Sequence, residues 1–189
     1  MNKRRTIFRI ISLGLLALFI SIWGVNYIKI NKTYPAAEYA KAKIGEDISY
    51  GDIRIKGIEY NNYCFDELKT NFGYSIDYTE YESYYNTDDL IFICVKVVVS
   101  NIGKNDLTIP LYNTTISSQT YSNGIDTSTF TAMNGGLEKL FPVVKAGDSL
   151  EINFTYTLFK SVLYKDYNEL PKLELIFQLY PQRLSICLN

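Results

Sequence analysis

Hydrophobic positions are arranged very differently in the first thirty residues and in the rest of the chain. An uncharged apolar run from Ile10 to Ile28 follows four basic residues, Lys3, Arg4, Arg5 and Arg9. As a helix, this run would be about 28 Å long, which is close to the hydrocarbon thickness of a bilayer. The pattern therefore predicts one transmembrane helix over residues 10–28.

The residues on either side of the apolar run predict whether the helix is cleaved and how it is oriented in the membrane. No pair of small residues stands at signal-peptidase spacing between Ser21 and Tyr27, and no cysteine directly follows the run, as a lipoprotein anchor would require. We therefore expect an uncleaved signal anchor in the cell membrane. The basic excess that ends at Arg9 predicts a cytoplasmic tail over residues 1–9 and an extracellular C-terminal domain. Trp23 and Tyr27 are expected at the outer membrane interface.

Beyond a stalk at residues 29–46, the pattern changes to the period of two that is typical of β-strands. The stalk contains the stretch AAEYAKAK, which can form a short helix. In the clearest strand, residues 90–100, one face carries Ile91, Ile93, Val95, Val97 and Val99, and the other carries Lys96. Further strands are predicted at residues 53–58 with a bulge at Gly57, and at 107–110, 111–121, 125–132, 150–159, 172–180 and 183–188.

Residues that favour turns and loops separate the predicted strands. Ser122-Asn123-Gly124 predicts a hairpin turn, because Asn-Gly favours the positive φ angles of such turns. Residues 133–141 are expected to form a loop. Seven or eight short strands separated by turns predict a single all-β domain at residues 47–189, either a β-sandwich or a barrel.

Composition excludes several classes of function. Beyond residue 10 the chain has 15 Lys and Arg residues against 20 Asp and Glu residues, so the domain is acidic and we expect no binding to nucleic acid. The chain has no histidine, which removes Ser-His-Asp and Cys-His catalysis and the usual zinc and copper sites. No phosphate-binding glycine loop occurs. We therefore expect no enzyme, no cofactor and no metal.

Three cysteines, Cys64, Cys94 and Cys187, fall in the predicted domain. An odd number argues against a disulfide framework. Three buried thiols, a Cys94–Cys187 disulfide and a Cys64–Cys187 disulfide all remain open.

One segment stands out as a candidate interaction surface, namely a tyrosine-rich and acidic insertion at about residues 68–88. Tyr74, Tyr78, Tyr81 and Tyr85 would form a stripe if the segment is helical, whereas a strand would place Tyr78, Glu80, Glu82 and Tyr84 on one face. A loop with a short helix is expected. Tyrosine is enriched in binding hot spots, but the stripe would equally serve to dock the insertion onto the domain.

Three runs of residues carry a resemblance to a known family. DLIFICVKVVVSNIGK at residues 89–104, the Asn123-Gly124 pair, and VVKAGDSLEINFTY at residues 143–156 resemble the DUF4352/DUF5028 group of Gram-positive cell-surface domains. The resemblance covers about residues 47–188 and implies an immunoglobulin-like antiparallel β-sandwich after a membrane anchor. The function of its members is unknown, so the resemblance implies no chemistry. The chain lacks the lipobox cysteine of many members.

Together these features favour a membrane-anchored binding module for an unidentified protein or peptide partner, such as an envelope-complex accessory or an immunity-type protein. Two alternatives remain open. The domain could bind cell-wall glycan or hydrolyse it weakly, because tyrosines stack on sugar rings and paired carboxylates can cleave glycosides. It could also be a structural spacer.

Overall fold

The computed structural model describes residues 3–118, 121–163, 172–178 and 181–188. Contacts divide the chain into two compact units, one ending at Glu38 and the other beginning at Tyr39. Each unit is described by itself.

The first unit is dominated by one helix, α1 (Lys3–Thr33). Its segment Phe8–Thr33 has a mean hydropathy of 2.1 and is long and apolar enough to cross a membrane. The helix predicted over residues 10–28 lies within it. Arg9, Trp23 and Tyr27 are all exposed on α1, and the two aromatic rings stack with centroids 5.4 Å apart. Positions four residues apart share one side of a helix, which permits this stacking.

The predicted stalk at residues 29–46 is wrong. Residues 29–33 continue α1, and β1 (Glu38–Lys43) is a strand rather than a short helix. β1 lies at the edge of a sheet, where it buries Ala42 and where Lys41 pairs with Glu174. Pairing in the sheet therefore outweighs the helix propensity of Ala and Lys.

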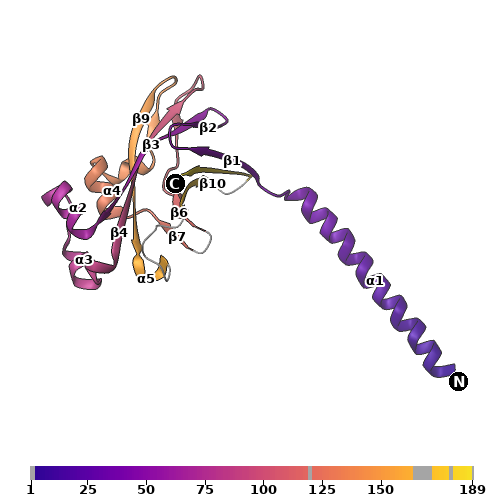
Figure 1. Cartoon of the computed structure of the whole chain (residues 1–189). Coiled ribbons are helices and arrows are strands. Elements are labelled where there is room, and N and C mark those ends of the chain that lie inside the picture. The colour runs from indigo at the N-terminus through magenta and orange to yellow at the C-terminus, as the bar shows by residue number, and fades with distance from the viewer. Residues whose placement is uncertain (1–2, 119–120, 164–171, 179–180, 189) are drawn as a thin grey trace. The chain divides into compact units, whose positions relative to one another are not determined.

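The strands of the second unit form two main sheets (Figure 1). One has the order β1-β11-β10-β6-β7 and the other the order β2-β3-β4-β9, while β5 and β8 form a separate ribbon. The strands are β2 (Asp47–Tyr50), β3 (Ile53–Cys64), β4 (Leu90–Asn101), β5 (Leu107–Thr108), β6 (Thr115–Ser117), β7 (Ser122–Gly124), β8 (Val143–Val144), β9 (Ser149–Phe159), β10 (Glu174–Gln178) and β11 (Gln182–Cys187). In the second sheet each strand pairs antiparallel with its neighbour.

Both sheets contribute to one hydrophobic core, so this unit is a β-sandwich. The core residues include Ile93, Val95, Val97 and Val99 of β4, Ile152, Phe154, Tyr156 and Leu158 of β9, and Ile116, Leu175 and Ile186 from the opposite sheet. The alternation predicted for residues 90–100 and 150–159 is confirmed. Lys96 lies on the outer face, 3.5 Å from carboxylate oxygens of both Glu59 and Glu151.

The bulge predicted at Gly57 is also confirmed. The register between β3 and β4 shifts between Gly57 and Glu59. A Cβ atom at Gly57 would lie 2.9 Å from Ile44 Cδ1 and 3.1 Å from Ile186 Cγ2. The glycine therefore allows the backbone to approach the opposite sheet closely.

Helices cover the outer face of the sheet that contains β4 (Figure 1). They are α2 (Phe65–Phe72), α3 (Thr79–Tyr84) and α4 (Thr127–Asn134). The remaining elements are the single-turn helices η1 (Gly73–Ser75), η2 (Thr87–Asp89) and η3 (Leu137–Leu140), and α5 (Lys160–Leu163). The insertion that was expected to be a loop with a short helix is thus mostly helical.

The strand predicted at residues 125–132 is wrong, since these residues belong mainly to α4. Asp126 caps its first turn, Phe130 buries its ring, and Gly135 ends it at a φ of 83°. The Asn123-Gly124 pair lies in strand β7 rather than in a hairpin turn, and the Asn123 amide donates to the Thr157 carbonyl at 2.6 Å. The loop expected at residues 133–141 contains the end of α4 and η3. Of the strand predicted at 111–121, residues 119–120 lie outside the described residues, and the described ones form a strand only in β6.

Candidate functional site

The predicted insertion forms a helical cap, residues 65–89, on the outer face of the sheet. At the start of α2 and of α3, a carboxylate side chain accepts a hydrogen bond from a nearby backbone N–H. The Cys64 N–H donates to Glu67 Oε2 at 2.9 Å, and the Thr79 N–H donates to Asp77 Oδ1 at 3.0 Å. These backbone hydrogen bonds lower the pKa of both carboxyl groups because they favour the charged form. These hydrogen bonds therefore fix the positions at which α2 and α3 begin.

A small aromatic core attaches the helical cap to β4. Its buried residues are Phe65, Leu68, Ile76, Tyr78, Tyr81, Leu90 and Phe92. Phe65 meets the Tyr78 ring edge to face at a centroid distance of 5.6 Å, and Tyr81 meets Phe92 in the same way at 5.3 Å. Such pairs stabilise a core beyond the area that they bury.

Two residues of the predicted interaction surface are therefore not at the surface. Tyr78 is only 8% exposed and Tyr81 only 5% exposed. Tyr78 donates its hydroxyl to the Leu68 carbonyl at 3.2 Å, and Tyr81 donates to Asp126 Oδ1 at 2.6 Å. Docking the insertion onto the sandwich accounts for both tyrosines.

The other predicted surface residues do lie on the outside of the helical cap. Tyr84 is 79% exposed and Tyr85 is 42% exposed; Glu80 and Glu82 are exposed as well. The backbone of Tyr74 lies in η1, and its side chain is outside the described part of the structure. The structure thus brings Glu80, Glu82, Tyr84 and Tyr85 together on and directly after one short helix.

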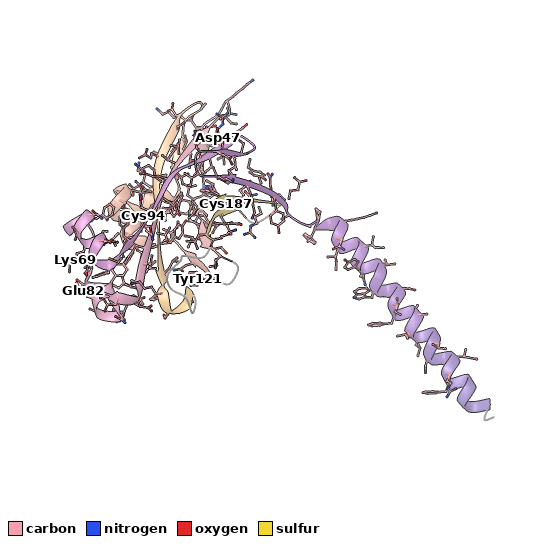
Figure 2. The ribbon with its side chains drawn as sticks, viewed as in Figure 1. Asp47, Lys69, Glu82, Cys94, Tyr121 and Cys187 are labelled. Atoms are coloured by element: carbon pink, nitrogen blue, oxygen red, sulfur yellow. The ribbon has the colours of Figure 1, made fainter. Side chains whose placement is uncertain are left out.

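The helical cap concentrates the negative charge of the domain. Residues 65–89 contain seven acidic residues and one lysine. That lysine, Lys69, pairs with Glu82 at 2.6 Å (Figure 2). Both side chains are about half exposed, so the pair contributes little to stability. Among the described residues, Glu80 has no ion-pair partner.

A pocket of about 360 Å³ lies beside this exposed face. It opens between α3, β7, the start of α4 and the end of β9. Its described lining residues are Glu80, Tyr81, Tyr85, Asn123, Gly124, Ile125, Asp126, Thr127, Ser128, Thr157 and Phe159. Tyr85 and Phe159 form one wall with ring centroids 5.5 Å apart.

Asp126 organises the floor of this pocket. Its carboxylate accepts hydrogen bonds from the Tyr81 hydroxyl, from the Thr129 N–H at 3.1 Å and the Thr129 hydroxyl at 3.0 Å, and from the Thr157 hydroxyl. Burial, together with the negative charge of Asp126, raises the pKa of Tyr81. A carboxylate that accepts from this many donors stays in a fixed position and carries its charge into the pocket.

Asp126 was not among the residues predicted from the sequence, although its position carried a signal. An Asp placed before Thr-Ser-Thr-Phe and nine residues before Gly135 is typical of a helix that begins with an N-cap and ends at glycine. The threonines of this segment favour the strand predicted at residues 125–132, and that prediction leaves no place for the helix cap or the pocket.

A second hollow, of about 390 Å³, lies between the ends of α2 and α4 on the same outer sheet face. Its lining residues are Glu59, Asn61, Tyr63, Phe72, Cys94, Lys96, Ala132, Met133 and Asn153. Burial raises the pKa of the Cys94 thiol to about 12, so this thiol is largely protonated and a weak nucleophile at neutral pH. Cys64, Cys94 and Cys187 are free, and each is half-buried.

Within the described residues, no group of three or more cysteine or carboxylate side chains is arranged to hold a metal ion. The site offers hydrogen-bonding groups, aromatic rings and negative charge, which are the elements of recognition.

The solved structures that resemble the chain include three bacterial proteins. A crystal structure of a conserved hypothetical protein from Bacillus anthracis has a TM-score of 0.49 at 9% identity, covering 76% of this chain and 94% of its own. An uncharacterized beta-sandwich protein from Clostridium difficile has a TM-score of 0.49 at 13% identity, with coverages of 81% and 96%. The yjhA protein from Bacillus subtilis has a TM-score of 0.47 at 12% identity, with coverages of 78% and 99%.

No curated protein matches the chain in sequence. A family model does match, over residues 43–184, which contain the helical cap and most of the sandwich. The chain therefore belongs to the family described as "Domain of unknown function (DUF5028)".

Proposed function

We propose that α1 is a single-pass signal anchor with its N-terminus in the cytoplasm, and that the sandwich is an immunoglobulin-like domain on the outside of a Gram-positive cell. The apolar segment Phe8–Thr33 and the basic residues before Ile10 support the anchor and its orientation. Two sheets around one core, with antiparallel pairing throughout the second sheet and between β6, β7, β10 and β11 of the first, support the immunoglobulin-like arrangement, and the resemblance to DUF4352 domains supports the surface location. Protease shaving of intact cells tests the orientation, because only an outside domain is removed.

The function of this outer domain is to bind a protein or peptide partner without catalysis. The observation that carries the proposal is the environment of Tyr84. This large aromatic side chain is 79% exposed on a helix whose neighbour, Tyr81, is locked in place by Phe92 and Asp126. An exposed tyrosine on a helix that is held in place gives contact area at a low entropic cost, as in binding hot spots.

Crosslinking of the full-length protein in its native membrane, followed by mass spectrometry, tests this proposal. The comparison is between the unaltered chain and Tyr84→Ala combined with Glu82→Gln. Neither side chain is buried, so we expect the fold to be retained. We expect the double variant to lose a crosslinked partner that the unaltered protein captures reproducibly.

Tyr112→Ala is the matched control, because Tyr112 is another exposed tyrosine, at 49%, but lies outside the helical cap. It should capture the partner normally. If the double variant captures the same partner in the same amount as the control, the helical cap is not the contact surface.

Binding of cell-wall glycan is a second candidate, favoured by a different surface. Tyr112 and Phe141 stack at 4.8 Å with an interplanar angle of 26°, and about half of each side chain is exposed. Exposed aromatic faces of this kind stack on sugar rings. A pull-down with purified cell wall tests it: glycan binding through this pair should be lost in Tyr112→Ala and retained in Tyr84→Ala.

A further inference from the structure

We propose that the pocket beside α3 accepts a lysine or arginine side chain of a peptide partner. This inference rests on the proposed binding function and specifies its chemistry. It is carried by the charge of the pocket, by the aromatic ring at its wall, and by its place next to Tyr84.

The charged groups that line the pocket are all negative. They are Glu80 and Asp126, and no lysine or arginine is among the described lining residues. The N-terminus of α4 offsets part of the Asp126 charge through the helix dipole, which is equivalent to about half a positive charge. Glu80 has no such compensation and no ion-pair partner among the described residues. Lys160, which directly follows the lining residue Phe159, donates to the Asp88 carbonyl at 2.6 Å.

The pocket wall adds an attraction that is specific to cations. Tyr85 is 42% exposed, so part of its ring is accessible, and its ring also contacts the ring of Phe159. The face of an aromatic ring attracts an ammonium or guanidinium group through its quadrupole. Carboxylates and an aromatic ring that line the same pocket therefore favour a cationic head on an apolar stem, which is the structure of a lysine or arginine side chain.

The size of the pocket fits the same ligand. Its volume of about 360 Å³ is at the lower end of ligand pockets, which range from about 300 to 1,000 Å³. One long side chain fits this space, and the residues that flank it in a peptide would meet the exposed Tyr84 on the same helical cap. A free polyamine would satisfy the charge but would leave Tyr84 without a contact.

The experiment uses the full-length protein in detergent micelles and three defined probes followed by NMR titration. The first probe is the peptide Ac-Ala-Ala-Lys-Ala-Ala-NH₂. The second has norleucine in place of lysine, which keeps the apolar stem and removes the charge. The third is spermidine. We expect the lysine peptide to shift the backbone amides of residues 124–128 and to bind at least about tenfold more tightly than the norleucine peptide.

Matched variants locate the binding. Glu80→Gln and Tyr85→Ala should each weaken binding of the lysine peptide about fivefold or more. Glu138→Gln removes the same charge and Tyr112→Ala removes a similar ring, both away from the pocket, so each should stay within about twofold. Raising the salt concentration should weaken the lysine peptide and leave the norleucine peptide unchanged.

Three results would overturn the inference: equal affinities for the lysine and norleucine peptides, equal effects of Glu80→Gln and Glu138→Gln, or spermidine binding as tightly as the lysine peptide. The last would identify a site for a small cation instead of a peptide. A failure of the proposed binding function can be distinguished from a failure of this inference. The binding function is tested by partner capture through Tyr84 and Glu82, and neither residue lines this pocket.

Discussion

Replacing Asp126 by Ala should destabilise the sandwich although this residue is only partly buried. The reason is that one carboxylate holds three elements together. It accepts from Tyr81 of α3, from Thr129 of α4 and from Thr157 of β9. Alanine removes these acceptors without filling the space.

The magnitude follows from the groups that lose their partner. Loss of the α4 N-cap costs about 1 kcal/mol. The Tyr81 hydroxyl loses its Asp126 acceptor on a side chain only 5% exposed, and such a loss costs about 1–3 kcal/mol. The Thr129 hydroxyl keeps its contact with Thr155 at 2.6 Å and adds little. We therefore expect the free energy of unfolding to fall by about 3 kcal/mol.

Urea unfolding of the full-length chain in micelles measures this change. Near-UV circular dichroism of the tyrosines is the suitable probe, because the one tryptophan, Trp23, lies in α1 and does not report on the sandwich. A double-mutant cycle with Tyr81→Phe isolates the contact between the two residues, and its coupling energy should be about 1 kcal/mol. Asp148→Ala is the control, since Asp148 is exposed and should change stability by less than about 0.5 kcal/mol.

The reasoning is refuted if Asp126→Ala costs less than about 1 kcal/mol, or if its effect simply adds to that of Tyr81→Phe. Either result would mean that water replaces the carboxylate at no cost, so that the polar floor of the pocket does not fix α3 to α4.

Two further predictions concern the sheet and the buried tyrosine. Gly57→Ala should lower the free energy of unfolding by about 1–3 kcal/mol, because the new Cβ would lie 2.9 Å from Ile44 Cδ1 and 3.1 Å from Cγ2 of the fully buried Ile186, which has little room to move; Gly124→Ala, with no atom within 4 Å of its Cβ, should cost nothing in the same urea experiment. Stability should also fall at alkaline pH, since burial raises the pKa of Tyr81. As the pH rises, the Tyr81 hydroxyl therefore loses its proton in the unfolded chain before it does so in the folded protein. Its contribution to the free energy of unfolding is complete below about pH 10. Above that pH the contribution declines by about 1.4 kcal/mol per pH unit, until the pKa of the folded state is reached. Urea midpoints between about pH 8 and 11 should show a shallower decline in Tyr81→Phe, and an unchanged slope would contradict the assignment.

The parts of the fold that the sequence predicts well are those in which one local pattern is decisive. β4 and β9 alternate because one face of each strand lines the core along its whole length, so a period of two survives in the sequence. The bulge at Gly57 could be predicted for a similar reason, since glycine inside a strand marks a close approach of two backbones. α1 needs only a long uncharged run.

Elements that depend on distant partners were less predictable. α4 has threonines that favour strands, and it becomes a helix because Asp126 caps it and Phe130 packs against Phe154 at 6.2 Å. β1 has a helix-favouring composition, and it becomes a strand beside β11, with the ion pair between Lys41 and Glu174. The Asp126 cap is a local signal, but Phe154 and Glu174 are far away in sequence from α4 and β1, so no local pattern contains either of these contacts.

The spacing of the tyrosines shows which of them attach the helical cap and which are exposed for recognition. The helical spacing correctly placed Tyr78 and Tyr81 on one face, and on an amphipathic helix that face is the one that packs inward. The stripe therefore marks the attachment of the helical cap, with Tyr85 at its rim beside Phe159. Tyr84 breaks the spacing, and for that reason it points to solvent with 79% of its surface exposed. In a short helix on a protein surface, the aromatic residue that departs from the buried period is the better candidate for recognition, because packing gives no reason for its presence.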